Sequence, residues 1–277
     1  GDGRPGWHIE CSTMSVQYLG DTIDIHGGGV DLVFPHHENE VAQSEAATGK
    51  PFVRTWMHNG LLTVGGEKMS KSLGNYHTIE DLLAGNHPEV IRYFLIASHY
   101  RSPIDFTEDR LQEAQKRLDY FYGLLQRLEE AISEGFAAAG GLAEDLDSGF
   151  RTSMEDDFNI PAVLGVLSSV AGRAQKALDD IATGSPSEDE GLTGLGEAIR
   201  RTGDILGLFQ EDPVAWFKWT PEAKGGGDAE IEALVEARTQ ARRDRDWKKA
   251  DQLRDELKVL GIVIEDGPKG TTWRRAR

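Results

Sequence analysis

The chain carries a short loop whose side chains are suited to handling phosphates. Residues 68–72 are Lys-Met-Ser-Lys-Ser, so two ammonium groups and two hydroxyls follow Gly65 and Gly66. Lysine provides a mobile positive charge, hydroxyls donate hydrogen bonds, and glycine lets the backbone approach an anion. This composition is typical of loops that stabilise charge in phosphoryl or nucleotidyl transfer. On composition alone, an ordinary polar surface turn remains the alternative.

A second group of residues offers three kinds of ligand atom to a metal ion. His36 and Glu40 are four residues apart, so a helix that begins near Pro35 would place both on one face. Cys11, the single cysteine, lies upstream. Zinc accepts sulfur, nitrogen and oxygen ligands. The spacing does not match the His-Glu-x-x-His pattern of metalloproteases, and a buried cysteine beside a polar helix remains the alternative.

Length and composition favour a soluble protein with more than one domain. A chain of 277 residues exceeds the usual size of a single domain. We expect a cytoplasmic protein without membrane contact, because no long apolar run and no signal-peptide pattern are found. One cysteine cannot form an internal disulfide, which agrees with a reducing compartment.

The charge is distributed unevenly along the chain. The formal net charge of −17 argues against binding of nucleic acid over the whole surface. Residues 238–277 contain twelve lysines and arginines and seven acidic residues, which gives this segment a local charge of +5. A localised RNA contact is therefore possible there, although an exposed helix with balanced charges is the simpler interpretation.

The first part of the chain has the pattern of half an α/β sheet. Residues 22–26 are strand-like, and the glycines 27–29 predict a turn after them. A helix is predicted over 36–48 with a stop at Gly49, followed by a strand over 60–64. In such sheets, ligands bind where strands end and helices begin.

The remaining chain is predicted to be mostly helical. Thr78 and Asp81 form a capping pair, and Pro88 opens a helix over 89–98. Over 107–133, apolar residues recur at helical spacing and predict a core stripe: Leu111, Ala114, Leu118, Phe121, Leu125, Leu128 and Ile132. The other predicted helices cover 150–156, 162–181, 195–208, 229–243 and 247–260, and short strands are predicted at 262–264 and 271–273.

Several segments share an order and spacing that are highly specific. They are residues 3–12 (Gly-Arg-Pro-Gly-Trp-His-Ile-Glu-Cys-Ser), 24–29, 31–32, 34–40, 68–72, 155–159 and 270–273. Together they resemble cysteinyl-tRNA synthetase, a class I aminoacyl-tRNA synthetase. The resemblance covers nearly the whole chain, and the acidic linkers are its least diagnostic parts.

This resemblance implies ATP-dependent activation of cysteine to cysteinyl adenylate and transfer to cysteine tRNA. Lys68 and Lys71 would be the catalytic residues that stabilise the departing pyrophosphate, with Mg²⁺ accompanying ATP. The resemblance places the adenosine part of ATP at His26, Gly28 and Asp31. Lys71 is expected to contact the phosphates of ATP.

The resemblance also implies that Cys11, His36 and Glu40 bind Zn²⁺, to which the thiolate of substrate cysteine would bind. Serine has almost the same shape, but its hydroxyl is a harder and less acidic ligand, so a zinc site can separate the two. Trp7 is expected to form an aromatic wall beside the substrate side chain. Core packing is the alternative for Trp7.

By the same resemblance, the helical middle and the basic terminal unit belong to the tRNA-binding side, with the terminal unit approaching the anticodon. The candidate tRNA contacts are Arg242, Arg243, Lys248, Lys249 and Arg254 to phosphates, and Trp273 as a platform for a base. Two alternatives remain open. Trp273 could belong to the core of a small domain, and several cations could pair with nearby aspartates.

The resulting expectation is a multidomain protein in which a partial α/β Rossmann-like catalytic region precedes an α-helical bundle and a small α+β anticodon-binding unit. The expected boundaries are 1–77 for the catalytic part with the zinc site and lysine loop, 78–106 for a connecting stem-contact region, 107–224 for the bundle and 228–277 for the basic unit. We expect a monomer.

The family's His-Ile-Gly-His-like signature and an upstream cysteine ligand are missing. We therefore expect the C-terminal part of the enzyme, inactive in adenylate formation by itself. The alternatives are a related ligase that joins cysteine to an amino sugar in mycothiol synthesis, and a noncatalytic tRNA-binding fragment.

Overall fold

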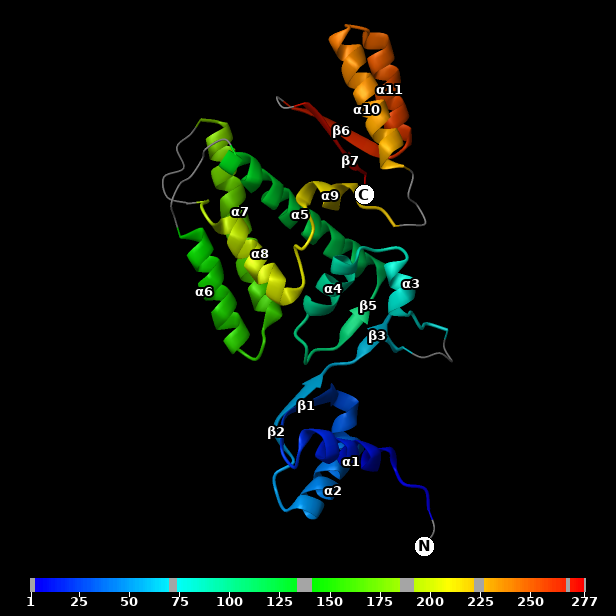
Figure 1. Cartoon of the computed structure of the whole chain (residues 1–277), viewed down its shortest axis with the longest axis vertical. Helices are drawn as coiled ribbons and strands as arrows, with labels where there is room; N and C mark the ends of the chain where they lie inside the picture. Colours follow the sequence, from blue (N-terminus) through cyan, green and yellow to red (C-terminus); the bar gives the residue numbers. More distant parts are fainter. Residues whose placement is uncertain are drawn as a thin grey trace. The chain divides into compact units, whose positions relative to one another are not determined.

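The structure is a computed structural model that describes residues 3–69, 74–133, 141–184, 192–221, 227–267 and 270–276 (Figure 1). It divides into two compact units. The first unit combines Gly1–Tyr76 with Leu95–Glu108, and the second combines His77–Phe94 with Asp109–Arg277. The division into four domains that we expected from the sequence stays a prediction.

The first unit is built around two parallel strands joined by a helix. Its elements are α1 (Trp7–Leu19), β1 (Ile23–Gly29), the short helical turns η1 (Val30–Leu32) and η2 (Val33–His37), α2 (Glu38–Thr48) and β2 (Val53–Asn59). β1 and β2 pair in parallel, as expected when a helix forms the crossover between them. The predicted helix is confirmed, and it ends at Gly49 in a left-handed conformation with φ of 71°.

The predicted turn at residues 27–29 is wrong, because these glycines form the end of strand β1. Their small size serves close packing. A Cβ on Gly28 would lie 2.9 Å from Cε1 of His37 and 3.0 Å from Cδ1 of Leu32. Glycine in a strand interior often marks such a close approach. Helix α1 and strand β2 were not predicted.

A second sheet of the first unit has three short strands in the order β4-β3-β5. Their bounds are Leu62–Val64 for β3, Glu67–Lys68 for β4 and Ile104–Phe106 for β5. β3 runs antiparallel to β4 and parallel to β5. Gly65 and Gly66 have φ of 60° and 79° and connect β3 to β4 as a two-residue hairpin turn, for which glycine is favoured.

The second unit is mostly helical, as predicted. Up to Lys218 its helices are α3 (Ile79–Leu83), α4 (Pro88–Ile96), α5 (Glu108–Ser133), α6 (Leu142–Glu155), α7 (Ile160–Ala182), α8 (Leu195–Leu206) and α9 (Pro213–Lys218), although the last two residues of α4 and the first of α5 are counted in the first unit. Thr78 and Asp81 form the predicted capping box at the start of α3. Helix α6 packs against both α7 and α8, which gives the predicted bundle (Figure 1). Helix α9 was not predicted.

The stripe predicted on α5 is buried except at its last member. Leu118 and Phe121 are fully buried in the middle of the helix, whereas Ile132 is 53% exposed. Ala131 is buried in the last turn instead. The periodicity of a sequence predicts which face of a helix is apolar, but not how far along the helix other elements cover that face.

The C-terminal part of the second unit is a helix-and-hairpin region, the small terminal unit. It contains α10 (Asp228–Arg243), α11 (Trp247–Val259), β6 (Ile262–Gly267) and β7 (Gly270–Arg275), with the two strands antiparallel. These elements confirm the predicted helices and strands. Most of the predicted link at 224–227 lies outside the described residues. The small core consists of Ile231, Val235, Leu257, Ile262 and Trp273. Within the described part of the chain, no helix is long and apolar enough to cross a membrane.

Candidate functional site

The junction of η2 and α2 buries a group of polar side chains in the first unit. His36, His37 and Glu40 are all buried, and Glu40 is only 1% exposed. Nε2 of His36 lies 2.6 Å from Oε1 of Glu40, as expected for residues four apart on one helix face. On its other side, Oε2 of Glu40 faces Nε2 of His26 from strand β1 at 2.9 Å.

Helix α1 brings the thiol of Cys11 to the same place. Ligand atoms of Cys11, His36 and Glu40 all lie within 4.8 Å of one another, so the three ligands predicted from the sequence converge. Burial, followed by the negative charges of Glu40 and Glu10, raises the pKa of the Cys11 thiol. A cation bound beside these groups would oppose that effect by stabilising the thiolate.

The carboxylate of Glu40 is the feature that best fits a metal ion. Both of its oxygens are buried without a hydrogen-bond partner among the described residues, even though ring nitrogens lie close to each. A buried carboxylate in this state is costly, whereas direct coordination of a divalent cation would satisfy both charge and geometry. The set of sulfur, nitrogen and oxygen donors fits zinc.

Trp7 borders this ligand cluster. Its ring centroid lies 4.4 Å from that of His36, with the planes inclined by 43°. The side chain is 62% exposed, which excludes the core-packing alternative. An open aromatic face next to the candidate metal centre is consistent with the predicted substrate wall, which stays a prediction.

Two further histidines that the sequence did not single out lie close by, and His37 forms a second possible ligand group with His26 and Glu40. Nδ1 of His37 lies 2.8 Å from Nε2 of His58, and Trp56 stacks on His58 at an interplanar angle of 7°. Burial and then the neighbouring histidines lower the pKa of His37 to about 4, so its ring is neutral at pH 7. The parallel pairing of Gly28 with His58 explains the proximity, but no local sequence signal predicts that pairing.

The residues predicted for ATP are only partly brought together. His26 and Gly28 lie on β1 beside Glu40 and His37, and Asp31 lies in the exposed part of η1. The backbone of Lys68 forms part of β4. Lys71 lies outside the described residues.

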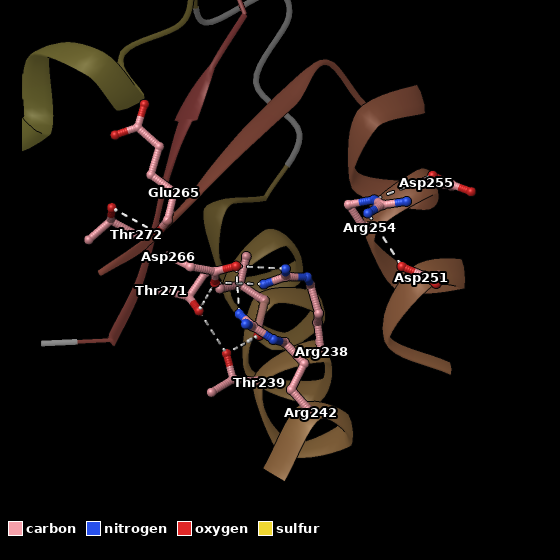
Figure 2. A network of polar contacts seen from close by, with 11 residues as sticks. Arg238, Thr239, Arg242, Asp251, Arg254, Asp255, Glu265, Asp266, Thr271 and Thr272 are labelled. Carbon is pink, nitrogen blue, oxygen red and sulfur yellow. Dashed lines mark hydrogen bonds and ion pairs between the residues drawn. The ribbon is translucent and has the colours of Figure 1, made fainter. Parts of the chain in front are cut away.

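In the small terminal unit, cations from α10 converge on one aspartate (Figure 2). Arg238 donates two hydrogen bonds of 2.9 Å to the two oxygens of Asp266, and Arg242 reaches Oδ2 at 2.5 Å. Thr271 donates a further bond of 2.8 Å to Oδ1. The hydrogen bonds from Arg238 and Thr271 hold the pKa of Asp266 far below its usual value. Arg242, a predicted phosphate contact, is thus paired within the protein.

The other predicted tRNA contacts differ in their surroundings. Arg254 contacts Asp251 at 3.3 Å and Asp255 at 3.7 Å (Figure 2). Three cations are exposed and, among the described residues, have no acidic partner within ion-pair distance: Arg243, Lys248 and Lys249. These are the strongest remaining candidates for phosphate contacts.

Trp273 belongs to the core of the small unit, the alternative that the sequence left open. It is 7% exposed, and the Lys218 ammonium lies 4.7 Å from its ring centroid. The guanidinium of Arg275 lies 5.7 Å from the same centroid. The predicted platform for a base is therefore a buried ring bordered by two cations.

Three sequence families match successive parts of the chain. Residues 1–116 match the tRNA synthetases class I (C) catalytic domain, 149–210 match the DALR domain, and 224–274 match the cysteinyl-tRNA ligase anticodon binding domain. Among solved structures, a Campylobacter jejuni protein described as an arginyl-tRNA synthetase has the same fold over 76% of this chain and 53% of its own, with a TM-score of 0.54 and 12% identity. The matched domains are those of class I aminoacyl-tRNA synthetases, and the fold agrees with this class.

Close relatives narrow the class further. The chain is 48% identical over 276 residues to the cysteine-tRNA ligase of Pseudomonas paraeruginosa, covering 100% of this chain and 57% of the relative. It is 49% identical over 275 residues to that of Alkalilimnicola ehrlichii, covering 99% and 57%. The chain belongs to the cysteinyl-tRNA synthetase family and spans somewhat more than half the length of these relatives. The family resemblance and the fold class predicted from the sequence are confirmed.

Proposed function

We propose that this chain supplies part of a cysteine-tRNA ligase, which activates cysteine with ATP and transfers it to cysteine tRNA. The observation that carries the proposal is the convergence of Cys11 and His36 on the buried carboxylate of Glu40. Sulfur, nitrogen and oxygen ligands from these three residues suit zinc, to which a substrate thiolate can also bind.

The residues around the centre would select and orient the substrate. Zinc, when bound, would supply a soft Lewis acid that favours the thiolate of cysteine over the hydroxyl of serine. His36 and His26 hold the Glu40 carboxylate from two sides. The exposed ring of Trp7 offers a wall for the substrate side chain, and neutral His37 adds no positive charge beside Glu40.

We assign the ATP phosphates to Lys68 and Lys71, with Mg²⁺, and the adenosine side to His26, Gly28 and Asp31. The match of residues 1–116 to the catalytic domain supports this assignment. Positive charge placed at the phosphates would stabilise the pyrophosphate that leaves when the cysteine carboxylate attacks the α-phosphate.

The proposed acceptor is cysteine tRNA. The match of residues 224–274 to an anticodon binding domain and the exposed cations Arg243, Lys248 and Lys249 support it. An amino-sugar acceptor would not need such a domain, so the mycothiol-pathway ligase is not favoured. The proposal includes a monomeric protein that works in the cytoplasm.

The test replaces the matching region of the Pseudomonas paraeruginosa relative by this chain and measures cysteine-dependent exchange of pyrophosphate into ATP. We expect exchange with cysteine, little with serine, and aminoacylation of cysteine tRNA. Circular dichroism confirms that the chimera is folded. A folded chimera that is inactive with cysteine, or equally active with serine, would refute the proposal.

The chain by itself tests the tRNA part. Equilibrium binding to cysteine tRNA and to an unrelated tRNA is measured at several salt concentrations, because phosphate contacts make affinity fall with salt. We expect preference for the cysteine tRNA and no useful pyrophosphate exchange by the chain alone. Equal affinity for both tRNAs would argue that this chain does not carry the recognition.

A further inference from the structure

The hairpin that leads to Lys68 has little structure of its own. Its backbone pairs are Thr63 with Lys68 and Val64 with Glu67, closed by the two-residue glycine turn. Strand β4 is two residues long and lies at the edge of its sheet. A hairpin this short is marginal by itself, so its orientation depends on contacts from outside it.

One side chain from strand β5 provides such contacts. Oδ1 of Asp105 accepts a hydrogen bond of 2.6 Å from Oγ1 of Thr63 and one of 2.7 Å from the amide of Gly66. Thr63 and Asp105 are also partners in the parallel pairing of β3 with β5. Asp105 therefore joins the body of β3 to the far end of the turn.

The hydrogen bond from Gly66 uses a backbone amide that the pairing of β3 with β4 does not use. In a two-residue hairpin turn, the closing hydrogen bond runs from the amide after the turn, here of Glu67, to the carbonyl before it. The amide of Gly66 is therefore available to an outside acceptor. Hydrogen bonds to an ionised carboxylate are about twice as strong as neutral ones, which makes Asp105 an effective anchor.

We propose that Asp105 is a positioning residue that fixes the β3–β4 hairpin and, through the pairing of Lys68 with Thr63, the backbone from which the phosphate-binding lysine extends. This inference rests on the proposed function, which assigns Lys68 to the ATP phosphates. A displacement of about 1 Å in a catalytic group can cost about 100-fold in rate, so an anchor for so short a hairpin would be visible in turnover.

The first test follows the hairpin directly in this chain. Amide hydrogen exchange at Gly66 is measured by NMR in the unaltered chain, in Asp105→Ala, which removes both acceptors, and in Asp105→Asn, which keeps one acceptor oxygen. We expect exchange at Gly66 to become about tenfold faster or more in Asp105→Ala, with most protection kept in Asp105→Asn. The control is Asp21→Ala, which removes another aspartate of the same unit whose partly exposed side chain pairs with Lys50.

The second test measures the consequence for catalysis in the chimera described above. We expect Asp105→Ala to lower kcat for cysteine-dependent pyrophosphate exchange by about 10- to 100-fold while KM for cysteine stays unchanged, and Asp105→Asn to restore most of kcat. A purely structural defect would instead reduce the folded fraction, with kcat per folded molecule unchanged.

The outcomes separate this inference from the proposed function. An active chimera whose kcat is unaffected by Asp105→Ala overturns the inference alone. An inactive unaltered chimera counts against the proposed function, and Gly66 exchange then decides whether Asp105 anchors the hairpin. Unchanged protection of Gly66 in Asp105→Ala overturns the inference in either case.

Discussion

Two buried glutamates, one in each unit, have opposite surroundings. Glu89 of α4 is 5% exposed and accepts hydrogen bonds of 2.8 Å from the amides of Phe209 and Gln210. The hydroxyl of Tyr122 donates to it at 3.0 Å. Glu40 is 1% exposed, and its two oxygens face only Nε2 of His36 at 2.6 Å and Nε2 of His26 at 2.9 Å, without a hydrogen bond of ordinary geometry to either.

The difference shows that burial alone does not reveal what a carboxylate does. Glu89 connects α4 to α5 and to the segment after α8, and its oxygens are satisfied by the protein itself. Arg92 of the same helix donates to the carbonyl of Leu206 and strengthens this connection. Glu40 instead faces ring nitrogens and a thiol, an arrangement in which a cation supplies what the protein does not.

The largest expected effect comes from removing the satisfied carboxylate. Glu89→Ala would leave two amides and a tyrosine hydroxyl without their acceptor and lower the free energy of unfolding by about 3–5 kcal/mol. Urea unfolding measures the change, with Glu80→Gln on exposed α3 as the control. A loss below about 1 kcal/mol would mean that Glu89 is not a structural hub.

For Glu40 the large effect should fall on metal affinity. Glu40→Gln removes an anionic ligand and should weaken zinc binding at least about 100-fold, since losing an outer-shell partner alone commonly costs 10- to 100-fold. Competition with a chromophoric chelator measures the affinity. The matched control is Glu38→Gln, which changes an exposed glutamate in the same helical turn. An equal loss of zinc affinity in both variants would show that Glu40 is not a metal ligand.

A third carboxylate, that of half-exposed Asp266, should make the stability of the protein depend on pH. Hydrogen bonds from Arg238 and Thr271 lower its folded-state pKa, so the unfolded chain binds the proton more readily. Its contribution to stability is therefore present above the ordinary aspartate pKa of about 4 and is lost as the pH falls below it. Between pH 7 and pH 3, the unaltered chain should lose more stability in urea than Asp266→Asn. Identical losses would show that this pair does not contribute to acid sensitivity.

The smallest expected effect is again at Glu40. In protein treated with a chelator, Glu40→Gln should change the free energy of unfolding by less than about 1 kcal/mol, or increase it, because the amide keeps a polar partner for the ring nitrogens of His26 and His36 and removes a buried charge. Thermal and urea unfolding provide the measurement. A destabilisation as large as that of Glu89→Ala would make Glu40 structural and remove the contrast between the two.

The sequence predicted the parts of this account that depend on local pattern. The spacing of His36 and Glu40 predicts their shared face, and the spacing along 107–133 predicts the buried face of α5. The convergence of Cys11 with them came from family resemblance, and the structure shows it directly.

Long-range pairing explains what the sequence did not predict. His58 reaches His37 because β2 pairs with β1, and Asp105 reaches Gly66 because β5 pairs with β3. The glycines at 27–29 look like a turn in isolation, but they belong to a strand, and Gly28 admits His37 and Leu32 against it. Such contacts depend on the register of strands far apart in the chain.

The most direct test of the metal centre is titration of this chain with Co²⁺ as a spectroscopic substitute for zinc. We predict binding of one equivalent with a thiolate-to-cobalt charge-transfer band that disappears in Cys11→Ser and remains in Glu38→Gln. An absence of binding, or a spectrum that is the same in Cys11→Ser, would contradict the assignment of Cys11, His36 and Glu40 as the metal site.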